Sequence, residues 1–147
     1  YLELLLSQEF ARARRYNLKL SVAMADIDHF KVINDTFSHQ VGDEVLRVIA
    51  RLFRQSIRSF DIIARYGGEE FVLILPETDI DEAVMVCERI RKTVESHDWS
   101  SIASGLSVTI SFGITDDMSR ENYEKLLSLA DIRLYEAKNG GRNQVRY

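Results

Sequence analysis

Hydrophobic residues along this chain follow two different periodicities, which predict its helices and strands. Apolar side chains recur every three to four residues in five stretches, as expected for helices with one buried face. In other stretches they are continuous or alternate with polar residues, which is typical of strands. We expect helices over residues 1–15, 30–37, 41–57, 79–97 and 123–138, and strands over residues 20–27, 61–66, 71–75, 107–115 and 144–147, the last at an edge of the sheet.

Residues that break regular structure separate these segments. Gly67-Gly68-Glu69-Glu70 lies between two strand-like runs and predicts a β-hairpin, because glycine readily adopts the positive φ that tight turns require. Pro76 ends the second of these strands, and Asn139-Gly140-Gly141 ends the last helix. We expect residues 38–40 to link two helices. The order of elements predicts an α/β fold with a mixed sheet that contains a hairpin and is flanked by helices; the hairpin argues against a doubly wound sheet.

Length and composition favour one folded domain. The chain has 147 residues, 46% of them hydrophobic and 29% charged, which is typical of a globular protein and excludes a disordered tail. A single cysteine, Cys87, excludes an internal disulfide and indicates a reducing compartment, so we expect a buried Cys87 and a cytoplasmic domain. The longest clean apolar run, Phe71 to Leu75, is far too short to cross a membrane.

Charge argues against some partners. The net charge is −4, and the basic residues form no strong stripe, which argues against binding to a nucleic-acid polymer. Single nucleotides remain possible ligands, because a few local charges and a metal ion suffice for them.

Four acidic residues are the first candidates for chemistry. Asp26 and Asp28 stand two apart at the end of an apolar strand, so both carboxylates would project from one face if the strand persists to Asp28, and Glu69 and Glu70 lie on the hairpin turn. If the hairpin is next to the first strand, these carboxylates repel one another, and a cation such as Mg²⁺ or Mn²⁺ would relieve the repulsion. Because Mg²⁺ usually takes phosphate oxygens of a substrate as further ligands, a nucleoside triphosphate is the candidate ligand. Taken alone, each motif favours a simpler reading: Asp28 caps a helix, and the glutamates occupy a solvated turn.

Several motifs together change that balance. They are Asp26-Ile27-Asp28-His29-Phe30-Lys31-Val32-Ile33-Asn34-Asp35, His39, Gly42-Asp43, Gly67-Gly68-Glu69-Glu70-Phe71, Ala130-Asp131, Tyr135, Ala137-Lys138 and Gly141-Arg142-Asn143. In this order, they closely resemble the diguanylate cyclase or GGDEF-domain family, in the variant that carries a Gly-Gly-Glu-Glu-Phe turn. The resemblance extends over nearly the whole chain.

The resemblance implies a palm-like domain, of the ferredoxin-like or nucleotidyl cyclase kind, that binds one GTP. Two such domains would face each other as a homodimer and join two GTP molecules into cyclic di-GMP, releasing two pyrophosphates. Two metal ions in each active site would be held by Asp26, the Ile27 carbonyl and Glu69. Glu69 or Glu70 would accept the proton from the attacking 3′-hydroxyl, and the sequence does not say which.

The same resemblance implies the residues that bind GTP. Asn34 and Asp43 would hydrogen-bond guanine; an Asp carboxylate can accept from the guanine N1 and amino groups, which adenine cannot satisfy. The remaining contacts fall into three sets: Phe30, His39 and Leu46 would line the base pocket, Lys31, Lys138 and Arg142 would bind phosphates, and Gly67 and Gly68 would let the backbone approach the nucleotide. Taken alone, Phe30 and Leu46 are better explained by core packing, and an ordinary helix end is the simpler explanation of the two C-terminal cations.

A second motif precedes the hairpin. Arg58-Ser59-Phe60-Asp61 resembles the RxxD inhibitory site of this family, at which bound cyclic di-GMP restrains the enzyme, and Arg89 resembles its supporting arginine. Arginine can grip a guanine or a phosphate with two hydrogen bonds. The simpler alternative is an exposed ion pair, which contributes less than about 1 kcal/mol.

The sequence departs from the family pattern in two places. Ser38 stands where the family usually has glycine, and the chain begins after the family's opening Leu-Thr-Gly-Leu stretch, so we expect a single domain, residues 1–147, excised from a longer multidomain protein. The alternative function is a weak or inactive GGDEF domain that only binds cyclic di-GMP or GTP. A third possibility is a domain for dimerisation or partner docking that binds no nucleotide.

Overall fold

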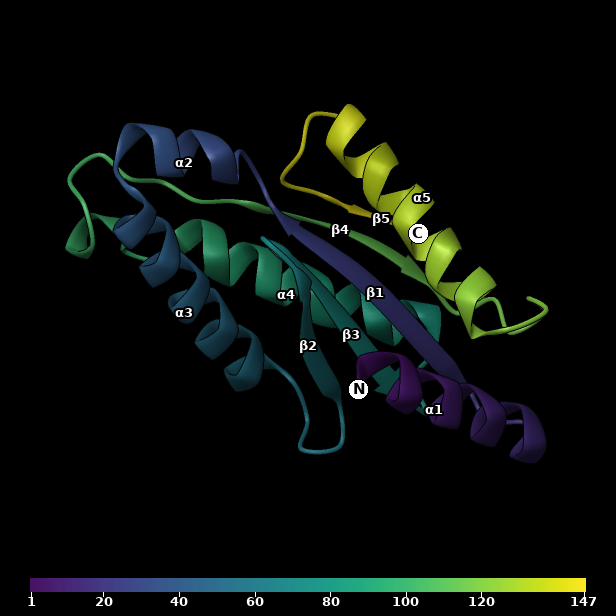
Figure 1. Cartoon of the computed structure of the whole chain (residues 1–147). Helices are drawn as coiled ribbons and strands as arrows, with labels where there is room; N and C mark the ends of the chain where they lie inside the picture. Colours follow the sequence, from purple (N-terminus) through teal and green to yellow (C-terminus); the bar gives the residue numbers. More distant parts are fainter.

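A computed structural model describes all residues from 1 to 147. The chain forms five α-helices, five strands and one short 3₁₀ helix, which Figure 1 shows in chain order. Their bounds are α1 (Leu2–Tyr16), β1 (Leu20–Ile27), α2 (Phe30–Thr36), α3 (His39–Ser56), β2 (Ile62–Gly67), β3 (Glu70–Pro76), α4 (Ile80–Ser96), η1 (Trp99–Ser101), β4 (Ile110–Thr115), α5 (Tyr123–Asn139) and β5 (Val145–Arg146).

The five strands form one mixed sheet in the order β2-β3-β1-β4-β5. Neighbouring strands are antiparallel except β4 and β5, which are parallel. All eight residues of the central strand β1 are buried. This arrangement confirms the predicted mixed sheet flanked by helices. It also places the hairpin next to the first strand, the condition on which the predicted gathering of carboxylates depends.

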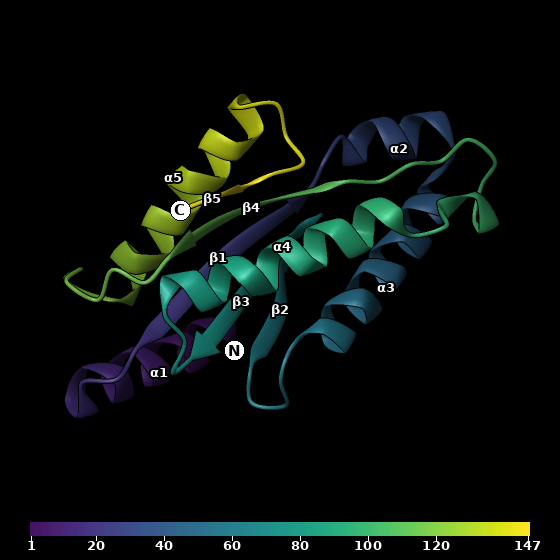
Figure 2. The same ribbon diagram turned by 180° about the vertical axis from the view of Figure 1, so that it is seen from behind.

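Helices cover both faces of the sheet. α3 and α4 pack on one face, and α1 and α5 pack on the other, as Figure 1 and the reverse view in Figure 2 show. Because successive side chains of a strand point to opposite faces, Ala23, Ala25 and Ile27 of β1 join the first core, whereas Val22 and Met24 join the second. Cys87 is fully buried in the first core, which confirms its structural role.

The predicted helices and strands are confirmed, with corrections at some of their ends. His39 and Gln40 belong to α3 instead of a linker, because the Ser38 hydroxyl caps the helix by accepting from the Val41 amide at 3.1 Å. β4 begins at Ile110, three residues later than predicted, and the η1 turn around the buried Trp99 was not predicted. No helix has both the length and the apolar composition needed to cross a membrane.

Candidate functional site

The end of β1 meets the tip of the β2–β3 hairpin. Asp26 is paired in register with Glu70 of β3 on one side and with Ser111 of β4 on the other. The Ile27 amide donates to the Glu69 carbonyl at 3.3 Å. The structure therefore brings together three of the acidic residues selected from the sequence, although the two glutamates lie more than 40 positions from Asp26 in the chain.

Asp26 is a buried carboxylate with one direct cationic partner. Its residue is only 6% exposed, and its Oδ2 atom accepts from Lys138 Nζ of α5 at 2.7 Å. Burial raises the pKa of Asp26; Lys138 opposes that shift, and the charges of Glu69 and Glu70 add to it. The opposing and reinforcing charges indicate a site where negative charge has gathered and is only partly neutralised.

The hairpin tip is tighter than the sequence predicted. The strands extend to Gly67 and from Glu70, so that the turn consists of Gly68 and Glu69 alone. Only Gly68 has a positive φ, 51°, in this turn. Arg65 Nε donates to the Gly68 carbonyl at 2.7 Å and holds the turn in place. A Cβ at either glycine would meet no protein atom within 4 Å, so that side of the turn is open.

A preassembled metal cage is not present. No group of three or more His, Cys, Asp or Glu side chains is arranged to hold a metal ion. Magnesium, however, usually binds through one or two protein carboxylates and completes its shell with water and substrate phosphates. Asp26 and Glu69 are carboxylates of that kind, and the contact between the Ile27 amide and the Glu69 carbonyl brings their two chain segments together.

A second group of predicted residues lies where α2 packs against α3. Asn34 and Phe30 of α2 face Gly42 of α3, and a Cβ built at Gly42 would come within 1.8 Å of Asn34 Oδ1. The glycine therefore makes room for the Asn34 side chain. His39 and Asp43, in the first turns of α3, are exposed to solvent.

A groove continues from Asp43 along α3. Its volume is about 360 Å³, and its walls come from α3, β2 and β3. The lining residues are Asp43, Leu46, Arg47, Ala50, Arg54, Ile63, Ala64, Arg65 and Phe71. Leu46 fits both roles considered for it, a wall of the base pocket and a core residue, because it lines this groove and is only 8% exposed in the first core.

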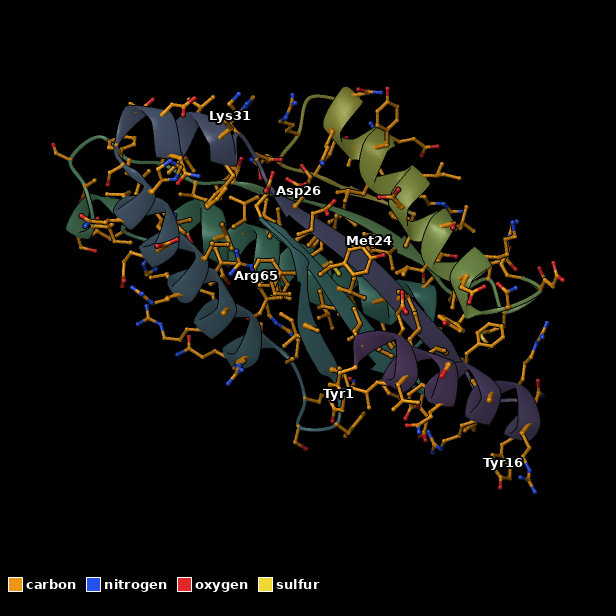
Figure 3. All side chains as sticks on the ribbon, in the orientation of Figure 1. Tyr1, Tyr16, Met24, Asp26, Lys31 and Arg65 are labelled. Carbon is orange, nitrogen blue, oxygen red and sulfur yellow. The ribbon has the colours of Figure 1, made fainter.

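The remaining predicted phosphate ligands are free to meet a ligand. Lys31 and Arg142 are exposed, and neither side chain forms a hydrogen bond or an ion pair within the chain. Figure 3 shows Lys31 in the first turn of α2 and Asp26 at the end of β1. Lys138 contacts Asp26 directly. The amide of Asn143, the residue after Arg142, contacts Asp28, so both segments lie beside the end of β1.

Asp28 does not cap α2. No side-chain hydrogen bond caps that helix, and its N-cap residue is His29. The Asp28 carboxylate instead accepts hydrogen bonds from Thr109, Ser111 and the Asn143 amide. The prediction that Asp26 and Asp28 share a face required the strand to persist to Asp28, but β1 ends at Ile27. Asp26 contacts Lys138 of α5, and Asp28 contacts the segment that follows α5.

The Arg58, Asp61 and Arg89 side chains gather near the C-terminal end of α3. The Arg58 amide donates to Asp61 Oδ2 at 2.9 Å, while Asp61 Oδ1 is buried without a partner. Arg89 of α4 donates to the Ser56 carbonyl at 2.6 Å. A pocket of about 390 Å³ has Arg58 and Asp61 in its wall and includes Arg54, which also lines the groove beside Asp43.

Sequence reasoning did not select Arg65 or the hydroxyls of Thr109 and Ser111. Arg65 stands three residues before Gly68, a spacing that fits a contact across a tight turn. Thr109, just before β4, and Ser111, within it, alternate with the apolar residues Val108, Ile110 and Phe112, and this alternation was a usable signal.

Comparison with known proteins gives consistent matches. The family model described as "Diguanylate cyclase, GGDEF domain" matches residues 1–144. The chain is 40% identical over 147 residues to diguanylate cyclase DosC of Escherichia coli K12, covering 99% of this chain and 32% of DosC. It is 45% identical over 130 residues to the response regulator PleD of Caulobacter vibrioides, covering 86% of this chain and 28% of PleD. The chain thus spans less than a third of the length of either relative.

Two solved structures are similar over nearly the whole chain. The GGDEF domain of DgcB from Caulobacter crescentus, in complex with c-di-GMP, matches with a TM-score of 0.92 and 34% identity, covering 99% of this chain and 86% of that one. The active GGEEF domain of a diguanylate cyclase from Vibrio cholerae matches with a TM-score of 0.89 and 34% identity, covering 96% and 90% of the two chains.

Proposed function

This chain belongs to the diguanylate cyclase (GGDEF domain) family, and on that premise we propose that it condenses two GTP molecules into cyclic di-GMP and two pyrophosphates. The observation that carries the proposal is the meeting of Asp26, the hairpin tip and Lys138 at the end of β1. Buried negative charge beside a lysine and an open glycine turn suits a triphosphate with its metal ions.

Two Mg²⁺ or Mn²⁺ ions would be held by Asp26, Glu69 and the Ile27 carbonyl. The donor set fits, because these are hard oxygen ligands. The pKa of Asp26 is raised mainly by burial and further by the charges of Glu69 and Glu70, and a bound cation would offset both effects. When bound, the ions lower the pKa of the attacking hydroxyl and neutralise charge on the triphosphate. Without them, Lys138 alone provides direct compensation to Asp26.

The α2–α3 contact would supply selectivity for guanine. Asn34 is held against Gly42, and the exposed Asp43 carboxylate opens on the groove along α3. A carboxylate accepts from guanine N1–H and its amino group, whereas adenine offers an unprotonated N1 at that edge, so ATP would leave Asp43 unsatisfied. Phe30, Leu46 and His39 would border the base.

The remaining residues would orient the phosphates and move the proton. Lys31, Lys138 and Arg142 would bind phosphate oxygens, and the open face of Gly67 and Gly68 would allow the backbone to approach them. Glu69 or Glu70 would accept the proton from the 3′-hydroxyl as it attacks the α-phosphate of the second GTP. Because one domain binds one GTP, two domains would face each other in a homodimer.

Product would restrain the enzyme at the Arg58, Asp61 and Arg89 site. Asp61 Oδ1 is buried without a hydrogen-bond partner and would accept from a guanine edge, and the Arg58 side chain, which makes no ion pair, would donate to a guanine or a phosphate. The relative DgcB was solved in complex with c-di-GMP, which supports binding of this product within the family. A cytoplasmic location agrees with the single buried Cys87 and completes the proposal.

A turnover assay tests the function. Purified chain incubated with GTP and Mg²⁺ should form cyclic di-GMP and pyrophosphate, with specific activity rising with protein concentration because the site is shared. Glu69→Ala and Glu70→Ala should abolish turnover, and Arg58→Ala should remove product inhibition while leaving initial rates unchanged. Product binding without any turnover would replace the cyclase with a cyclic di-GMP receptor.

A further inference from the structure

The Asp28 carboxylate is buried and fully engaged by hydrogen-bond donors. The residue is 4% exposed and forms no ion pair. Its Oδ1 accepts from Ser111 Oγ at 2.7 Å, and its Oδ2 accepts from Thr109 Oγ1 at 2.8 Å and from the Asn143 amide at 2.9 Å. Both oxygens therefore have protein partners, which distinguishes Asp28 from Asp26 and argues against a role as a metal ligand.

These donors tie together segments that are distant in the chain. Ser111 belongs to β4, the strand beside β1, and Thr109 immediately precedes that strand, whereas Asn143 lies in the segment between α5 and β5. The Asn143 side chain is held separately, by Arg91 Nη1 at 2.9 Å and by Glu95. Asp28 thus fixes the backbone at this point, while α4 fixes the side chain.

The segment that Asp28 holds has an unfavourable backbone conformation. Arg142 and Asn143 have φ values of 63° and 47°, and Gly141 before them has 114°. The left-handed region disfavours most residues with a Cβ, arginine more than asparagine, so two such residues in succession need other contacts to hold them. The Arg142 amide donates to the Ala137 carbonyl at 3.0 Å, and the Asn143 amide to Asp28 is the next contact along the backbone.

Arg142 itself remains free. Its side chain is exposed and makes no hydrogen bond within the chain, although the backbone on both sides of it is anchored. An arginine that binds phosphate bidentately requires a defined starting point, because a shift of about 1 Å at the backbone spoils the paired geometry.

We infer that Asp28 is a positioning residue, which holds the Asn143 amide and so fixes the backbone from which Arg142 reaches the phosphates of GTP. This inference rests on the proposed function. It gives the two aspartates of Asp26-Ile27-Asp28 different roles. Asp26 would bind the metal ions, and Asp28 would position the arginine that binds phosphate.

A double-mutant cycle tests this role. The ligand is a GTP analogue with a methylene group between the α- and β-phosphates, which cannot lose pyrophosphate, and its Kd is measured by calorimetry with Mg²⁺. Asp28→Asn should weaken binding about tenfold in the unmutated background, as expected for the loss of one charge-assisted phosphate contact. In an Arg142→Ala background the same change should weaken binding less than about twofold, because Asp28 then has nothing to position.

Thr109→Val is the matched control. It removes a hydrogen bond from the same Asp28 oxygen and keeps the side-chain shape, but it leaves the Asn143 contact intact, so binding should change less than about twofold. Asp28→Glu, which keeps the charge and moves the carboxylate by one methylene, repeats the cycle if Asp28→Asn does not fold. Hydrogen exchange at the Asn143 amide should accelerate in either Asp28 variant and not in Thr109→Val.

Two outcomes distinguish failure of the positioning role of Asp28 from failure of the proposed cyclase function. Equal weakening by Asp28→Asn with and without Arg142 would overturn the positioning role alone. Failure of the unmutated chain to bind the analogue would overturn the proposed function, and this inference with it.

Discussion

Replacement of Gly42 by alanine should damage GTP binding far more than folding. A Cβ at this position would lie 1.8 Å from Asn34 Oδ1, 2.9 Å from Asn34 Cγ and 3.3 Å from Phe30 Cζ. Carbon atoms in ordinary contact stay about 3.5 Å apart or more, so the Asn34 side chain has to leave its place. The obstruction is the end of a side chain and not backbone, which allows α2 and α3 to stay packed.

The expected change in stability is smaller than the expected change in GTP affinity. Alanine in a helix is favoured over glycine by about 1 kcal/mol, and a displaced Asn34 rotamer costs about 0.5–1.5 kcal/mol, so the free energy of unfolding should change by less than about 1 kcal/mol. Loss of the Asn34 contact leaves a guanine group unsatisfied, at a cost of about 1–3 kcal/mol. That cost corresponds to a Kd for GTP raised about 5- to 150-fold.

Calorimetry with the same methylene analogue measures the binding, and urea denaturation measures the stability. The control is Gly42→Ala in an Asn34→Ala background, where the displaced side chain is absent and the added methyl group should no longer affect affinity. Wild-type affinity in Gly42→Ala would refute the reasoning, as would the same loss of affinity in both backgrounds.

Three further predictions concern stability. Ser38 has φ 156° and ψ 165°, a region that glycine occupies far more readily, so Ser38→Gly should stabilise the chain by about 1 kcal/mol in urea denaturation, whereas Ser38→Ala, which only loses the cap, should destabilise it by about as much. Gly113→Ala would place a Cβ 2.1 Å from the Leu134 amide nitrogen of α5 and should lower thermal stability by about 3 kcal/mol or more, since backbone must move; an unchanged melting temperature would contradict this close packing. The Asp79 cap of α4 lowers the pKa of its carboxyl below 3.8, so the stability lost in Asp79→Ala should be constant above that pH and shrink as the pH falls through the lowered pKa; a difference independent of pH would exclude the carboxylate.

Much of the site was within reach of the sequence. The residues at the end of β1, on the hairpin and on α2 and α3 were selected from their order in the chain and from a family resemblance. The metal ions, their number, the homodimer and the inhibitory site at Arg58 stay predictions. What the sequence did not predict is which of these residues contact one another: Lys138 meets Asp26 although 112 positions separate them.

Local periodicity determined the helices, the strands and the hairpin of this protein, because spacings of two and of three to four residues reflect which face of an element is buried. Only the tertiary structure decided the strand order, the packing of Asn34 against Gly42 and the partners of Asp28, which lie 81 to 115 positions away. Hydrogen bonds and close contacts depend on the direction and separation of atoms in space. A one-dimensional pattern of polar and apolar residues does not contain that geometry.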